Sequence, residues 1–216
     1  MINLRGSMMV AALGFVALAS TPARADLIIS CSGQSGCGTL ASTTTNDRLD
    51  YANHTFGNFS IGPLTILGVL LDAGGLMDVT NLDVSSSGGG SISLFFTETN
   101  LSAGAAAEFI MSFTGNLSGD MTDTRSFYLD PTNGGGQSIL LGSCSGGTCA
   151  IQTSLLQNLQ GLFSITEEID LTARGAGKLS SDDDILLPEP AALSLFGVAL
   201  LALGFLWRRR KLHDRA

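Results

Sequence analysis

The chain has 216 residues, of which 44% are hydrophobic and 14% are charged, and its formal net charge is −8. The charge is unevenly distributed, because residues 26–187 hold 4 Lys and Arg against 17 Asp and Glu, a net charge of −13. Such an acidic segment excludes a nucleic-acid binder, since it could not neutralise a row of phosphates. No apolar run within it reaches the roughly 20 residues that span a bilayer. Its length suits one domain with its own core.

The N-terminus has the three parts of a secretory signal peptide. Arg5 gives it a positive start, an uncharged apolar stretch covers residues 8–19, and small side chains precede a suitable cleavage site. We expect residues 1–25 to form a signal helix that signal peptidase removes, so that the rest of the chain is exported. The residues expected at the cleavage site are Ala23, Ala25 and Asp26.

The C-terminus also has three parts, which together suit a sorting signal at a membrane. Residues 191–207 carry no charge and would measure about 26 Å as a helix, enough to cross a bacterial inner membrane. A basic tail follows, and it keeps that end in the cytoplasm by the positive-inside rule. A Pro-Glu-Pro tripeptide precedes the helix, and its prolines hold the chain extended. The tripeptide is Pro188, Glu189 and Pro190, and the tail is Arg208, Arg209, Arg210 and Lys211.

Residues 188–211 closely resemble the PEP-CTERM sorting domain in the tripeptide, the apolar helix and the basic tail. The resemblance implies that exosortase, a membrane transpeptidase-like enzyme, recognises the tail and removes it during export. It also implies a Gram-negative source, an inner-membrane precursor, and a mature protein at the cell surface or in the extracellular matrix, with exopolysaccharide as the expected partner. Residues 180–187, with three consecutive aspartates, are expected to form a disordered acidic linker that keeps the tripeptide accessible.

Four cysteines stand as two close pairs in this exported segment. An oxidising compartment favours disulfides, and the close spacing favours two local loops, Cys31–Cys37 and Cys144–Cys149, among three possible connectivities. A zinc site is the alternative, but the spacing of these cysteines suits zinc poorly. We therefore expect two disulfides and no metal.

The segment between the two ends alternates between short apolar runs and Gly-rich turns. Apolar and polar residues alternate over 165–173, and the runs 91–97 and 108–114 are similar, as is typical of strands with one buried face. The fuller apolar run 64–71 suits a strand buried on both faces. The predicted turns are 72–75, 88–90, 114–116, 133–136 and 174–177. The fold class predicted for residues 26–179 is all-β, an antiparallel β-sandwich-like domain, flanked by the signal helix and the transmembrane helix.

The sequence offers little for catalysis. His54 is the single histidine of residues 26–187, no Gly-x-Ser-x-Gly motif is present, and the cysteines are expected to be oxidised. The carboxylates are too numerous to single out a catalytic pair. We therefore expect no enzymatic activity and no cofactor.

Sugar binding usually needs exposed aromatic faces with a hydrogen-bonding rim. The one tryptophan, Trp207, lies in the removable tail, which leaves Tyr51, Tyr128 and eight phenylalanines. Acidic loops such as 182–184 could attract Ca²⁺, but none has the EF-hand spacing. The sequence predicts a structural or adhesive surface protein associated with exopolysaccharide. The alternatives are a polysaccharide-binding module that uses polar loops, with or without calcium, and last a secreted hydrolase.

Overall fold

The computed structural model describes residues 26–44, 48–68, 75–102, 107–146, 148–155, 159 and 161–186. The segments expected to be the signal peptide, 1–25, and the sorting signal, 188–211, lie outside the described residues, and so do the two helices expected there. In the described part the chain forms twelve strands and no helix. The described residues therefore include no helix that could cross a membrane.

The strands follow one another along the chain without intervening helices. They are β1 (Asp26–Ser32), β2 (Thr39–Thr43), β3 (Arg48–Tyr51), β4 (His54–Phe56), β5 (Phe59–Ile61), β6 (Leu64–Gly68), β7 (Gly75–Ser86), β8 (Gly90–Ser102), β9 (Ala107–Asp130), β10 (Ile139–Ser145), β11 (Cys149–Leu155) and β12 (Leu162–Leu186). The strands predicted at 91–97, 108–114 and 165–173 are confirmed as parts of β8, β9 and β12.

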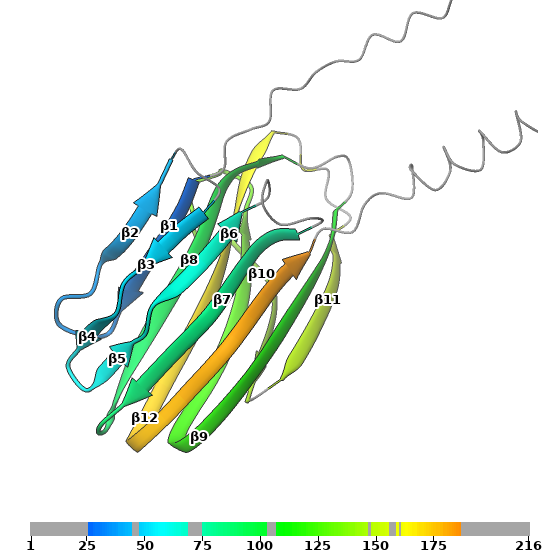
Figure 1. Ribbon diagram of the computed structural model, residues 1–216. Helices are drawn as coiled ribbons and strands as arrows, with labels where there is room; N and C mark the ends of the chain where they lie inside the picture. Colours follow the sequence, from blue (N-terminus) through cyan, green and yellow to red (C-terminus); the bar gives the residue numbers. More distant parts are fainter. Residues whose placement is uncertain are drawn as a thin grey trace, which may run out of the picture.

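All of these strands belong to one antiparallel sheet that folds over into two layers (Figure 1). Layer one contains β2, β1, β8, the first half of β12, the second half of β9, and β10. Layer two contains β3 to β7, the second half of β12, the first half of β9, and β11. The predicted all-β, antiparallel fold is confirmed, with the difference that the two layers are continuous through β9 and β12.

Glycines allow β9 and β12 to pass from one layer to the other. The ladder between these strands is interrupted between Ala173 and Gly177, and Figure 1 shows both strands turning over at the lower edge. Gly119 has a φ of 74°, and a Cβ there would overlap the carbonyl oxygen of Ala176 and lie 2.7 Å from Gly177 Cα. Such close contact between two backbones at positive φ requires glycine. We call this the corner.

Two predicted turns are therefore wrong. Residues 174–177 form the bend inside β12, and residues 114–116 lie within the continuous strand β9. The run 64–71 also differs from its prediction, because over Leu64–Gly68 alternate residues are buried and half-buried, so β6 buries only one face. In contrast, residues 88 and 89 connect β7 to β8, and residues 133–136 follow β9, as predicted.

The core lies between the two layers and is built from the inward residues of each strand, as a period of two requires. Phe109 packs at 6.2 Å from Phe127 and at 6.3 Å, edge-on, from Phe163, measured between ring centroids. These contacts join strands from both layers. The largest fully buried apolar side chains include Phe59, Phe96, Phe109, Phe113, Phe127 and Phe163.

The acidic linker predicted at residues 180–187 is wrong, because the chain remains in strand β12 through Leu186. This part of β12 is paired with β7 on one side and with β9 on the other. Its side chains alternate, with Asp182 and Asp184 exposed and Asp183 buried. The folded domain thus extends beyond the predicted boundary at residue 179, and Leu187 lies outside the described residues.

Candidate functional site

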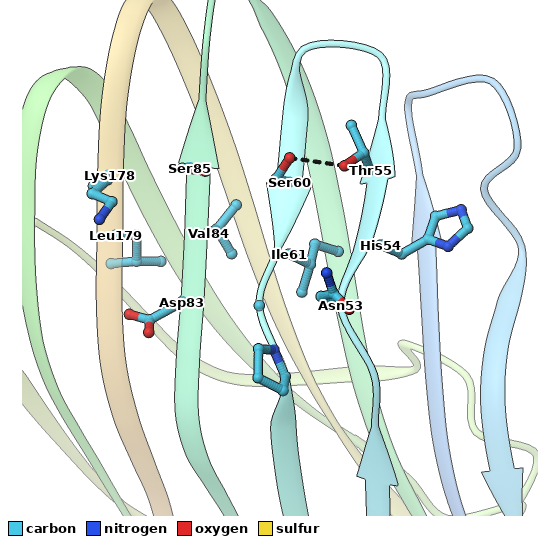
Figure 2. A pocket seen from close by; sticks show the side chains of 12 residues that line it. Asn53, His54, Thr55, Ser60, Ile61, Asp83, Val84, Ser85, Lys178 and Leu179 are labelled. Carbon is cyan, nitrogen blue, oxygen red and sulfur yellow. Dashed lines mark hydrogen bonds between the residues drawn. The ribbon is translucent and has the colours of Figure 1, made fainter.

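The outer face of layer two carries two adjoining hollows. The first, of about 330 Å³, is lined from β4, β5, β7 and β12 (Figure 2). The second, of about 450 Å³, is lined from β3, β6 and β7. Pro63 and Asp83 line both, so the hollows adjoin, and we call the pair the trough. Its polar and aromatic side chains are Asp50, Tyr51, Asn53, His54, Thr55, Ser60, Thr65, Asn81, Asp83, Ser85 and Lys178.

Alternation along β7 and β12 places two charged groups in the trough. Leu82 and Val84 point into the core, so Asp83 between them is exposed, and Lys178 is exposed next to the buried Leu179. Neither Asp83 nor Lys178 has a side-chain hydrogen bond or ion pair with another described residue. Figure 2 shows the two on neighbouring strands, with His54 on the opposite side of the hollow. Their charged groups are therefore available to a ligand.

The wall between the hollows is the connection from β5 to β6. The backbone N–H of Gly62 donates a hydrogen bond of 2.7 Å to the carbonyl oxygen of Asp83. A Cβ at Gly62 would lie 3.2 Å from Asp83 Cβ, so a glycine allows this close approach. Pro63 follows directly and separates the two hollows.

The second hollow has one carboxylate in a fixed position. Arg48 donates to Asp50 through Nε at 3.0 Å and through Nη2 at 2.9 Å, and Thr65 Oγ1 donates to it at 2.7 Å. These hydrogen bonds lower the pKa of Asp50. Partial burial raises the pKa of neighbouring Tyr51, whose side chain packs against the core on the opposite face of β3 from Asp50. This end of the trough therefore presents an oriented carboxylate acceptor beside the hydroxyl of Thr65.

The first hollow contributes neutral polar groups. Thr55 Oγ1 and Ser60 Oγ are 2.9 Å apart and share a hydrogen bond. The His54 ring contacts Phe56, with centroids 4.5 Å apart. Together the trough offers hydroxyl, amide, carboxylate and ammonium groups, which suit a ligand rich in hydroxyl groups.

A second cluster of charged side chains is sealed between the layers, and we call it the core ionic cluster. It consists of Asp123, Arg125, Glu167 and Asp183, each at most 4% exposed. Arg125 Nε donates to Asp123 at 3.1 Å, and its Nη1 forms an ion pair with Asp183. The guanidinium also lies 5.3 Å from the centroid of the Phe113 ring, a cation–π contact.

Neighbouring groups donate hydrogen bonds to the carboxylates of the core ionic cluster and leave space for its guanidinium. The backbone N–H of Gly146 donates to Asp123 at 2.8 Å, and Ser181 Oγ donates to Asp183 at 3.3 Å. A Cβ at Gly115 would lie 3.1 Å from Arg125 Nη2, so this glycine leaves room for the guanidinium. Gly115 therefore serves a contact in the core and not the turn predicted at 114–116.

The carboxyl groups of the cluster titrate abnormally because of burial. Burial raises the pKa of Glu167 well above its usual range, the charge of Asp183 raises it further, and Arg125 opposes the rise. Burial also raises the pKa of Asp183 to about 6, against the effect of Arg125. Neither oxygen of Glu167 makes a hydrogen bond of ordinary geometry within the described part, although Asp183 is near enough to affect its pKa.

A polar loop after β9 closes over the outer face of layer one. The Asp130 carboxylate accepts hydrogen bonds from the N–H groups of Thr132, Gly134 and Gly136 and from the hydroxyls of Thr132 and Ser138. Hydrogen bonds from Thr132, Gly136 and Ser138 hold the pKa of Asp130 at about 2, although its burial acts in the opposite direction. One carboxylate thus organises the whole loop.

The structure contains both expected disulfides. Cys31–Cys37 lies between β1 and β2, with Cα atoms 5.0 Å apart, and Cys144–Cys149 joins β10 to β11, with Cα atoms 6.6 Å apart. Asp26, expected to follow the cleavage site, is the first residue of β1. The other predicted site residues lie outside the described residues: Ala23, Ala25, Pro188, Glu189, Pro190, Arg208, Arg209, Arg210 and Lys211.

Two features of the site were not foreseen from the sequence. The trough joins residues from six strands, and no local motif marks it. The core ionic cluster joins residues up to 60 positions apart in the chain. The sequence feature that could have revealed it is Arg125, which stands at an inward strand position between Asp123 and Phe127. Within the described ranges, no three His, Cys, Asp or Glu side chains gather as a metal site would require.

Solved structures with some likeness to this chain include carbohydrate-binding modules. One is described as "CBM4 structure and function", with 12% identity and a TM-score of 0.35, covering 65% of this chain and 94% of the other. TmCBM61 in complex with β-1,4-galactotriose has 13% identity and a TM-score of 0.29, covering 57% and 80%. The mannan-recognising module TmCBM27 has 10% identity and a TM-score of 0.31, covering 65% and 87%. Likeness this low says nothing about what the present chain binds.

A search of curated proteins found no match. Residues 187–211 match the family described as the PEP-CTERM protein-sorting motif, which confirms the resemblance predicted for residues 188–211. The chain therefore carries a PEP-CTERM protein-sorting motif at its C-terminal end, which marks it as an exosortase substrate exported to the cell surface.

Proposed function

We propose that the mature protein is a non-catalytic surface or matrix protein that adheres to exopolysaccharide through the trough. The observation that carries the proposal is a pair of adjoining hollows on one exposed face, with the charged groups of Asp83 and Lys178 and the oriented carboxylate of Asp50. A few directed polar groups in a concave site can fix the orientation of a ligand rich in hydroxyl groups.

The shape of the trough supports a chain-like ligand. The hollows measure about 330 and 450 Å³, and they meet at Pro63 and Asp83. Each is within the range of roughly 300–1,000 Å³ that is usual for small ligands. Two open hollows in sequence suit successive units of a polymer better than one small molecule.

The charge of this face favours a neutral or amino-substituted glycan over an acidic one. Residues 26–187 have a net charge of −13, which repels a polymer rich in carboxylates. Among the described side chains, the outer face of layer two has five acidic groups and two basic ones. They are Asp50, Asp78, Asp83, Asp182 and Asp184, with Arg48 and Lys178.

The maturation route belongs to the same proposal. Signal peptidase cleaves before Asp26, the precursor is held in the inner membrane by residues 191–207, and exosortase acts at Pro188-Glu189-Pro190. The first strand begins at Asp26, so the folded domain starts where the signal peptide is expected to end.

The proposal is tested by sedimentation of the released protein with exopolysaccharide purified from the same cells. We expect the double variant Asp83→Asn/Lys178→Gln to bind at least about tenfold more weakly, because two charged hydrogen-bonding groups are lost. Asp120→Asn is the matched control, since Asp120 is an exposed aspartate at the corner that lines neither hollow. Equal binding by all three proteins, or breakdown of the polymer by the wild type, would contradict the proposal.

A further inference from the structure

The core ionic cluster has more negative groups than positive ones. One guanidinium, from Arg125, serves both Asp123 and Asp183, while Glu167 lies beside Asp183 with no cation of its own. From β8, the fully buried Glu98 faces the same core, and its Oε1 lies against Gly68 of layer two. Burying an ionised carboxylate that has no cation beside it is costly, so Glu167 favours its protonated form.

The cluster also bridges the two layers. Arg125 and Glu167 belong to the halves of β9 and β12 in layer one, whereas Asp183 belongs to the half of β12 in layer two. Any change of charge on Glu167 or Asp183 therefore acts directly on the contact between the layers. These charges lie away from the bulk solvent, because Arg125, Glu167 and Asp183 are each at most 1% exposed.

We propose that Glu167 and Asp183 share one proton in the folded protein, so that the two layers are held firmly in acid and loosen as the external pH rises. This pH dependence is separate from the proposed adhesive function, and testing it requires no ligand. An exported domain meets the pH of the surroundings, so the proton count of its core changes with that pH.

The direction follows from proton linkage. The pKa of both Glu167 and Asp183 is raised by burial above the value expected in the unfolded chain. The folded state thus binds protons more tightly, and its stability is complete below the ordinary carboxyl pKa. Stability is lost as the pH rises, first through about 6 for Asp183 and then further as Glu167 ionises.

The test is the melting temperature of the released protein from about pH 4 to about pH 9. We expect the wild type to melt highest near the acid end and progressively lower toward alkaline pH. Glu167→Gln keeps the shape of the side chain and removes its ionisation, so its profile should be flatter above neutral pH. Glu168→Gln, the next residue and half-buried on the outer face, should keep the wild-type slope. Parallel profiles for the wild type and Glu167→Gln would overturn the proposal.

A second measurement does not require a variant that folds. The carboxyl ¹³C signal of Glu167 in the wild type reports its proton directly. We expect this signal to remain in the protonated position at pH values above 4.5, the ordinary pKa of a glutamate side chain. Titration of Glu167 at the ordinary glutamate pKa of 4.5 would overturn the proposal.

Discussion

Arg125 in layer one forms an ion pair with Asp183 in layer two, across the core of the domain. Asp183 is the central member of an acidic triplet for which the sequence pattern predicted a disordered linker. The pair anchors the last part of β12 between β7 and β9 and extends the fold to within two residues of the sorting tripeptide.

Removal of Arg125 should destabilise the domain strongly. Arg125→Met leaves Asp123 and Asp183 buried without a cation, and the expected loss of unfolding free energy is about 3–5 kcal/mol. Urea unfolding at neutral pH measures it. The double variant Arg125→Met/Asp183→Asn removes one of the stranded charges and should recover part of the loss. If the double variant is less stable than the single one, the pairing is not what stabilises the core.

Gly119 should tolerate no side chain. Gly119→Ala combines an unfavourable positive φ with overlap on the backbone of β12, and we expect a loss of about 3 kcal/mol. Gly146 separates the two effects, because its φ is 75° and a Cβ there would meet no atom within 4 Å. Gly146→Ala should cost only about 1 kcal/mol. Equal losses in thermal unfolding would contradict the close contact at the corner.

Asp130 should set the acid limit of stability. Its pKa is lowered to about 2, so it contributes stability above the ordinary value of 3.8 that is lost as the pH falls toward 2. The shift corresponds to about 2 kcal/mol. Unfolding free energies measured from about pH 5 down to about pH 2 should fall in the wild type and stay flatter in Asp130→Asn. If the unfolding free energy of the variant fell with decreasing pH as steeply as that of the wild type, Asp130 would not organise the loop.

The sorting signal should determine the C-terminus of the released protein. Mass spectrometry of that protein should give a mature chain from Asp26 to the neighbourhood of Pro188. Glu189→Ala should block processing and leave the precursor in the membrane fraction, because it removes the charged group of the tripeptide. A wild-type protein intact through Ala216 would contradict the exosortase route.

Regular alternation made the strands predictable. Ile165, Ile169 and Leu171 occupy inward positions of β12, with Glu167 at the inward position between the first two. The apolar members of this pattern predict a strand with one face in the core. The two local disulfides followed from their spacing in the same way. Such features depend on neighbours in the sequence.

The core ionic cluster and the corner could not be predicted in this way. Asp183 is buried where Arg125, 58 residues earlier in the chain, pairs with it. The local sequence shows three consecutive aspartates and does not indicate which of them is buried. Gly115 looked like a turn, yet its space is filled by the Arg125 guanidinium. The trough is likewise assembled from separate strands, none of which carries a motif of its own.

The most direct test of the adhesive function is an NMR titration of the labelled, released protein with oligosaccharides prepared from the exopolysaccharide of the same cells. We predict that the amide signals of Tyr51, Asn53, Ser85 and Lys178, around the trough, shift with saturation. The signals of Thr124 and Asp170, on the outer face of layer one, should not move. An absence of shifts, or shifts confined to layer one, would contradict the proposal that the trough holds the polysaccharide.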